Sequence, residues 1–364
     1  MKKLVSLILC LATIVFAVGC KKEKYPEIKS SKEEAKVMMS FNIGNDKYEM
    51  KYELYRALFL NFSTQYDKGD KTFWTKEDSK DELAELNEKI LEYTLDIFAV
   101  LHVSKSIGFD PYSDDVEATI AEYIEKSVEG DGDTIIGFGG DYDAYLEHLK
   151  ASNLNYSVQK LLYRYSIAYD KIIEHYEGVT NSNNPSENQN GALVYTYQDV
   201  LAFYNGNQSV RVSPVVINAA YISYERALEI RNAIASATST QDALNTAIMN
   251  TAANETDINE GVVIGTYTLD SAYYSDVSET AFSLGANETS EVITVTTENS
   301  TEYWILYARE KNNDHFNKNY DSIVSVFTSQ KIGEIINSAK QTLKNSRSET
   351  SDYKNLNHAS ISMK

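Results

Sequence analysis

The sequence contains very little cysteine. Its 364 residues include only Cys10 and Cys20, both close to the N-terminus. From residue 21 onward there is therefore no thiol for a disulfide, a metal site or a cysteine nucleophile. The folded part of the chain has to be stabilised by packing and by non-covalent polar contacts.

Motifs that carry catalytic chemistry are also missing. The five histidines stand far apart, and none forms an i, i+4 pair or an HExxH motif. No Gly-x-Ser-x-Gly motif occurs, nor a Ser-x-x-Lys nucleophile with its supporting motifs. The glycines within 137–140 are followed by no Lys-Ser or Lys-Thr pair, so they do not indicate a phosphate-binding loop. We expect no metal, no nucleotide and no other cofactor.

Positive charge is scarce relative to negative charge. There are 34 Lys and Arg residues against 53 Asp and Glu, which gives a formal net charge of -19. Such a surface repels phosphate backbones, and no basic patch in the sequence would neutralise them. The composition therefore excludes nucleic acid as an expected partner.

The one long apolar run lies at the N-terminus. Lys2 and Lys3 precede an apolar segment over 4–18, which ends in Gly19 and Cys20. A basic start, a short apolar core and a small-residue end are typical of an export signal, whereas a spanning helix needs roughly 20 apolar residues. Residues 17–20, Ala-Val-Gly-Cys, resemble a bacterial lipobox, which implies cleavage after residue 19 and acylation of Cys20, for example with palmitate. An ordinary signal peptide or an uncleaved anchor is the alternative.

Hydrophobic periodicity predicts a largely helical N-terminal half. Residues 20–36 are charged and carry Pro26, which is typical of a flexible tether. Alternation over 37–50, around Asn45 and Asp46, predicts a pair of strands. The period of 3.6 predicts helices over 51–66, 80–106, from 113, over 142–151 and over 156–176. The strongest apolar seam comprises Leu83, Leu86, Ile90, Thr94, Ile97 and Leu101.

The C-terminal half predicts a mixed module behind a polar linker. Residues 179–193 bury little and form the expected linker. The module, over 194–312, is expected to contain a strand over 210–223, helices over 224–236, 241–252 and 275–282, a loop at Gly261 and Gly265, and strands over 292–296 and 303–308. A last helix is expected within 313–344, followed by a disordered tail over 345–364.

This order of parts resembles the exported foldases of the SurA and PrsA type. In the N-terminal half the resemblance rests on Asn42 and Gly44 of the strand pair and on the segments 106–109, 113–116 and 142–146. In the C-terminal half the segments 281–284, 287–290 and 292–294 resemble a parvulin peptidyl-prolyl isomerase domain, with Asn287 where the family usually has glycine.

The resemblance implies an α+β fold with two domains. The first is a helical, SurA- or trigger-factor-like chaperone domain over 37–178, with a short β-hairpin and a returning C-terminal helix over 313–344. The second is a parvulin-like α+β domain over 194–312. The signal peptide over 1–19, the lipidated tether over 20–36, the linker and the tail complete the expected organisation.

The resemblance further implies a proline pocket whose floor carries two histidines and a Cys or Asp. The first strand, within 212–222, contains no histidine in any register, and Trp304 stands at the place of the second. The Cys or Asp position falls near Ala253 or Asn254, with Asp257 off register. Only Thr294 keeps a plausible family identity. The candidates for the degenerate pocket are Tyr273, Tyr274, Val277, Phe282, Thr294 and Trp304.

These residues favour binding over catalysis. Rotation about an X-Pro bond has a barrier of roughly 20 kcal/mol, and loss of the whole polar floor is hard to reconcile with its efficient catalysis. We therefore expect a membrane-tethered chaperone that binds unfolded exported polypeptides on the outer face of the cytoplasmic membrane. Two alternatives stay open, an active peptidyl-prolyl isomerase with a divergent pocket and an envelope lipoprotein that binds a small solute.

Overall fold

A computed structural model describes residues 24–76, 79–132, 135–177, 191–206, 208–249, 255–265, 275–297 and 300–363. The described chain divides into two compact units: unit 1 comprises 176–333, and unit 2 comprises 24–175 together with 334–363. Each unit combines helices with a small antiparallel sheet, so the fold is α+β, as the sequence predicts. Within the described ranges, no helix is long and apolar enough to cross a bilayer.

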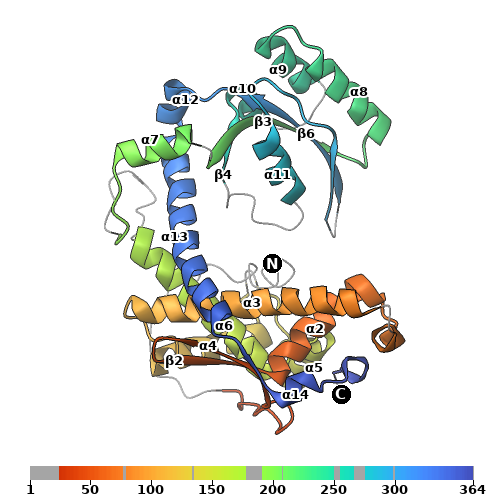
Figure 1. The fold of residues 1–364 in the computed structure, drawn as a ribbon, viewed down its shortest axis with the longest axis vertical. Coiled ribbons are helices and arrows are strands. Elements are labelled where there is room, and N and C mark those ends of the chain that lie inside the picture. Colours follow the sequence, from red (N-terminus) through yellow and green to blue (C-terminus); the bar gives the residue numbers. More distant parts are fainter. Residues whose placement is uncertain are drawn as a thin grey trace. The chain divides into compact units, whose positions relative to one another are not determined.

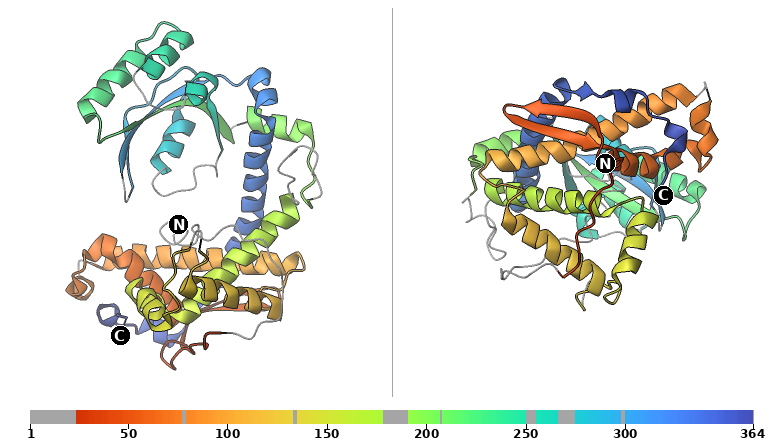
Figure 2. Two further views of the ribbon diagram at one scale, coloured as in Figure 1. Left: turned by 180° about the vertical axis from the view of Figure 1, so that it is seen from behind. Right: turned by 90° about the horizontal axis from the view of Figure 1, so that it is seen from below.

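Unit 2 consists of a three-stranded sheet and a set of helices (Figures 1 and 2). The strand order is β2-β1-β7, and Gly44 turns the β1–β2 hairpin with a φ of 58°, a conformation that glycine adopts without strain. The strands are β1 (Val37–Ile43), β2 (Asp46–Lys51) and β7 (Ser348–Glu349). The helices before the linker are α2 (Tyr52–Asp67), η1 (Lys71–Thr75), α3 (Lys80–Ser106), α4 (Asp114–Glu129), α5 (Tyr142–Ala151) and α6 (Tyr156–Glu177).

The long helix α3 supplies much of the core of unit 2. The predicted seam is confirmed from Leu86 onward, because Leu86, Ile90, Ile97 and Leu101 are each at most 4% exposed. Leu83, at its start, is only partly buried. Thr94 belongs to the same seam, and its buried hydroxyl donates to the carbonyl of Ile90 at 2.9 Å. A polar side chain therefore occupies the core without an unpaired donor.

The segment before β1 is packed against unit 2. The ring of Tyr25 stacks on Tyr142 with centroids 5.0 Å apart, and its hydroxyl donates to Glu129 at 2.8 Å. The hydroxyl of Tyr142 donates to the carbonyl of Pro26 at 2.8 Å. The prediction of a flexible tether is therefore wrong for residues 24–36, because partners more than 100 residues away in sequence hold this segment.

The C-terminal segment is ordered as well. After β7 the chain forms α14 (Ser351–Lys354) and η5 (His358–Ser360). Ile361 is 1% exposed, and Nε2 of His358 lies 3.0 Å from the hydroxyl of Tyr55. The prediction of a disordered tail over 345–364 is wrong for the described residues, because β1 and α2 supply the partners that its polar composition does not reveal.

The last helical stretch differs from the expected single helix. It consists of α12 (Asn313–Lys318) and α13 (Tyr320–Asn345), separated at Asn319. Residues up to Gly333 belong to unit 1 and residues from Glu334 to unit 2. The prediction that the whole segment 313–344 packs on the helical domain is therefore wrong for residues 313–333.

Unit 1 has a four-stranded antiparallel sheet with the order β4-β3-β6-β5. Helices α8 and α9 cover one face of this sheet, and α11 lies against the other (Figures 1 and 2). Its elements before α12 are α7 (Tyr197–Asn205), β3 (Ser209–Asn218), α8 (Tyr224–Ala235), α9 (Thr240–Met249), α10 (Glu255–Glu260), β4 (Val262–Gly265), α11 (Ser275–Ser283), β5 (Ile293–Thr296) and β6 (Thr301–Arg309).

Three of these elements were not predicted. The sequence indicated a loop at Gly261 and Gly265, but Val262–Gly265 forms the edge strand β4, which pairs with the start of β3. Helices α7 and α10 were missed too. All three are short, so their local periodicity gives little signal.

Candidate functional site

The predicted site falls on the sheet face that α11 covers, here called the α11 face. Side chains alternate along a strand, so Val212 and Val216 of β3 share this face with Trp304 and Leu306 of β6. The face is apolar. Its buried residues are Val212, Ile264, Val277, Ala281, Val295 and Leu306, and the partly buried residues packed against them are Val210, Val262, Phe282, Leu284, Ile293 and Trp304.

Trp304 stands in the middle of a cross-strand row. It pairs with Val216 of β3 on one side and with Ile293 of β5 on the other. Its indole Nε1 donates to Oε2 of Glu302 at 2.9 Å. The polar atom of the ring is thus satisfied within β6, which leaves the ring to make apolar contacts on the α11 face.

The structure places the predicted residues of the degenerate pocket in different environments. Phe282 and Trp304 lie on the α11 face and are partly exposed. Val277 is fully buried and is therefore a core residue. Thr294 pairs with Tyr303, so it points to the opposite face and does not share a surface with Trp304. Tyr273, Tyr274, Ala253, Asn254 and Cys20 lie outside the described residues.

One histidine belongs to unit 1, and it lies elsewhere. His315 of α12 has Nδ1 3.1 Å from the hydroxyl of Tyr204 and Nε2 3.4 Å from the carbonyl of Gly261. Burial, together with the nearby Arg211 guanidinium, lowers the pKa of His315 to about 4. Arg211 precedes Val212 on β3 and so points away from the α11 face. The imidazole is a neutral core group on the other side of the strand.

The described part of the α11 face therefore offers no imidazole or thiol. Its residues are aliphatic or aromatic, with the carboxylate of Glu302 engaged by Trp304. Such a surface can take apolar groups out of water, but it has no positioned group for proton transfer.

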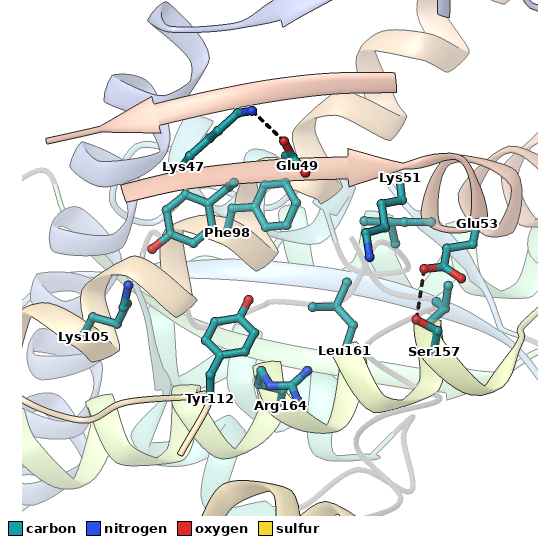
Figure 3. Close-up of a pocket in the computed structure, with 13 residues that line it drawn as sticks. Lys47, Glu49, Lys51, Glu53, Phe98, Lys105, Tyr112, Ser157, Leu161 and Arg164 are labelled. Atoms are coloured by element: carbon teal, nitrogen blue, oxygen red, sulfur yellow. Dashed lines mark hydrogen bonds and ion pairs between the residues drawn. The ribbon is translucent and has the colours of Figure 1, made fainter. Parts of the chain in front are cut away.

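A second concave site lies in unit 2 (Figure 3). It is a pocket of about 340 Å³ bounded by β2, the start of α2, and helices α3 and α6. Figure 3 shows Lys51 reaching into it from the β2 side, with Tyr112 and Arg164 on the opposite side. The pocket is lined by Lys47, Tyr48, Glu49, Lys51, Glu53, Leu54, Phe98, Lys105, Tyr112, Ser157, Val158, Leu161 and Arg164.

The carboxylates that line this pocket already have partners. Glu53 is only 3% exposed and accepts hydrogen bonds from Ser30 at 2.5 Å and from Asn155 and Ser157 at 3.0 Å each. Glu49 lies 2.6 Å from the ammonium of Lys47. Neither is an unsatisfied acceptor.

The aromatic end of the pocket has a different character. Tyr48 is 6% exposed, and its buried hydroxyl has no hydrogen-bond partner in the described chain. Burial, with Asp46 and Tyr112 nearby, raises the pKa of Tyr48 well above its ordinary value, so the group stays a neutral O–H. The guanidinium of Arg164 lies over the ring of Tyr112, 4.7 Å from its centroid.

This pocket was not predicted from the sequence. Its residues come from separate segments between 47 and 164, and none belongs to a recognisable motif. The only local signal is the alternation of β2, which turns Tyr48 inward. Nor do the described residues bring together three or more metal-ligating side chains.

Comparisons with known proteins give matches among solved structures. No family model and no curated protein matches the chain. It is similar to the foldase protein PrsA from Streptococcus pneumoniae, with 15% identity, a TM-score of 0.27, and coverage of 86% of this chain and 97% of that one. It is also similar to PrsA from Lactococcus lactis, with 15% identity, a TM-score of 0.25, and coverage of 87% of this chain and 96% of that one. A third similar structure is the peptidylprolyl isomerase PrsA from Bacillus anthracis, with 14% identity, a TM-score of 0.25, and coverage of 68% of this chain and 94% of that one.

Proposed function

We propose that this protein is a membrane-tethered extracytoplasmic chaperone of the foldase type, which binds unfolded exported polypeptides. In this proposal unit 1 has the parvulin-like fold but binds client chains without isomerising them. The observation that carries the proposal is the composition of the α11 face, where Trp304 stands at a position that the resemblance assigns to histidine.

The partly exposed residues of that face support a binding role. Phe282, Leu284, Ile293 and Trp304 lie together and are only partly buried. An unfolded chain exposes apolar side chains, and burying them stabilises a complex by roughly 25 cal/mol per Å² before the costs of association. Aromatic rings supply such area with little loss of side-chain entropy.

The packed N-terminal segment supports a position close to a membrane. If Cys20 carries the lipid, the chain from Cys20 to Lys24 spans at most about 14 Å. From Tyr25 onward the chain is held by Tyr142 and Glu129. The anchor would therefore keep the surface of unit 2 around Tyr25 next to the bilayer, facing newly exported chains.

The first experiment measures chaperone activity. We expect the full-length protein to suppress aggregation of a reduced, denatured model protein, and Trp304→Ala to lose roughly half of that effect or more, because the ring is the centre of the apolar row. Tyr169→Ala, which removes a surface tyrosine of α6, serves as the control and should behave as wild type. No suppression by wild type at molar excess rejects the proposal.

The second experiment separates binding from catalysis. In a protease-coupled proline-peptide assay we expect the full-length protein to leave the isomerisation rate at its uncatalysed value. A rate enhancement that Trp304→Ala abolishes would instead establish the alternative, an isomerase with a divergent pocket.

The third experiment tests the anchor. Cys20→Ser should abolish incorporation of labelled palmitate and release the protein from the membrane fraction. Cys10→Ser is the matched control and should remain in that fraction. Equal release of both variants contradicts lipidation at Cys20.

A further inference from the structure

The pocket of unit 2 contains hydrogen-bond donors that are not fully used. Its two carboxylates, Glu49 and Glu53, already have partners. The hydroxyl of Tyr48 is buried and unpaired. The ammonium of Lys105 lies 2.6 Å from Oδ1 of Asp46, which accounts for one of its three N–H donors. A buried hydroxyl without a partner costs free energy that a bound acceptor would recover.

These donors lie at one end of the pocket. Tyr48, Lys105, Tyr112 and Arg164 all line the pocket, and the guanidinium of Arg164 lies 4.7 Å from the ring centroid of Tyr112. Figure 3 shows Lys105 and Tyr112 on the same side, with Arg164 beside Tyr112. An acceptor that carries negative charge suits this end best, because an ammonium can only donate and its bonds to anions are the strongest.

The rest of the pocket is apolar at its centre. Figure 3 shows Phe98 and Leu161 between the Tyr112 end and the end marked by Glu53 and Ser157, and Leu54 also lines the pocket. A volume of about 340 Å³ is at the lower limit for ligand sites in proteins and is large enough for one or two amino-acid residues.

We propose that this pocket binds the C-terminal residue of a polypeptide, with its carboxylate at Tyr48, Tyr112 and Lys105 and its apolar side chain against Phe98 and Leu161. The inference deepens the proposed function, because it names one group of a client chain that unit 2 recognises, and it rests on that function for the class of ligand. The site itself is independent of the α11 face, which belongs to unit 1.

The test is a calorimetric titration of the full-length protein with three N-acetylated peptides. The first is Gly-Leu-Phe with a free carboxylate, the second is its C-terminal amide, and the third is the amide of Gly-Glu-Leu-Phe. We expect the free acid to bind about tenfold more tightly than either amide, since only it places a carboxylate beside the apolar side chain. Equal affinity of the free acid and its amide overturns the proposal. Equal affinity of the free acid and the glutamate peptide overturns the assignment to a chain end.

Two tyrosine variants test whether the hydroxyl of Tyr48 donates to the peptide carboxylate. Tyr48→Phe should reduce the preference for the free acid at least about threefold while leaving the thermal midpoint unchanged or higher, because an unpaired buried hydroxyl is removed. Tyr145→Phe alters another buried tyrosine of unit 2, outside the pocket, and should bind as wild type. A lowered midpoint in Tyr48→Phe, or an equal loss of affinity in Tyr145→Phe, contradicts the assignment.

The charge is tested separately. Lys105→Gln should also lose the preference for the free acid, whereas Lys150→Gln, which removes an exposed lysine of α5, should keep it. These titrations do not use the aggregation assay. A protein that suppresses aggregation but shows no acid preference would therefore retain the proposed function and lose this inference alone.

Discussion

The ammonium of Lys340 on α13 lies 2.6 Å from Oδ1 of Asp96 on α3. A second carboxylate, Glu92, is 2.8 Å from the same ammonium. Burial disfavours ionisation of both Lys340 and Asp96, but the two carboxylates raise the pKa of Lys340 above its ordinary value, so it stays charged. Within unit 2 the pair joins α3 to the part of α13 from Glu334 onward, more than 200 residues apart in sequence.

Removing this lysine should destabilise unit 2 strongly. Lys340→Met leaves Asp96 buried without its partner, and we expect a loss of about 3 kcal/mol in the free energy of unfolding. The double variant Lys340→Met/Asp96→Leu should recover most of the loss, because both charges are then gone. Urea unfolding followed by the fluorescence of Trp74 in a Trp304→Phe background reports on unit 2, since the chain has only these two tryptophans.

Lys344 provides the matched control for that measurement. Its ammonium contacts Glu88 and Glu92, but its side chain is 35% exposed. Lys344→Met should therefore cost only about 0.5 kcal/mol. Equal effects of the two lysine substitutions would mean that the pair with Asp96 is no stronger than a surface ion pair.

Glu34 should make the stability of unit 2 sensitive to acid. Burial alone raises its pKa, but hydrogen bonds from Ser31, Arg56 and Asn155 outweigh this and lower it from 4.5 to about 2. A depressed pKa stabilises the fold above pH 4.5, and that contribution disappears as the pH falls toward 2. Glu34→Gln should cost roughly 2 kcal/mol at pH 7 and flatten the pH dependence of unfolding within this window. Glu33→Gln, at an exposed neighbour, should do neither.

Local pattern predicted the long helices well. The bounds expected for α3 and α5 are those observed, because each carries an apolar stripe at helical spacing and ends in a clear stop. The tether and the tail were predicted wrongly for a related reason. Their stability comes from single contacts such as Tyr25 on Tyr142 and His358 on Tyr55, which link distant parts of the chain and leave no periodic trace.

In the candidate sites, too, some features follow from local sequence and others depend on contacts between distant parts of the chain. That Trp304 occupies a strand position could be predicted from the run of aromatic and aliphatic residues in β6. That Thr294 points to the other face depends on its pairing with Tyr303, which local sequence does not specify. The pocket around Tyr48 combines side chains from β2, α2, α3 and α6, so its existence depends on the packing of elements that no linear motif encodes.

Ile361 should anchor the C-terminal segment to unit 2. It is 1% exposed, and the nearby η5 packs against η1, which contains Trp74. Ile361→Ala should cost about 3 kcal/mol through lost burial and the cavity left behind. Ile28→Ala, at a residue 43% exposed, should cost less than about 1 kcal/mol. Both are measured by urea unfolding with Trp74 as the reporter. A silent Ile361→Ala would mean that the tail contributes nothing to unit 2.

His315 should make unit 1 lose stability in mild acid. Its pKa falls from 6.5 to about 4 because it is buried, with Arg211 and Arg309 close by, while its ring accepts from Tyr204 and donates to Gly261. A folded pKa below the unfolded one means that the unfolded chain takes up the proton first. Stability is therefore fully present above pH 6.5 and declines as the pH falls toward 4.

Between pH 7.5 and 5.0 this proton should cost unit 1 about 2 kcal/mol. The window lies above the ordinary pKa of carboxylates, so His315 dominates it. The measurement is urea unfolding followed by Trp304 fluorescence in a Trp74→Phe background. His315→Asn should remove the pH dependence, whereas His175→Asn, on α6 in unit 2, should leave it intact. A pH dependence that persists in His315→Asn would place the titrating group elsewhere and undo the assignment of His315 as a neutral core residue.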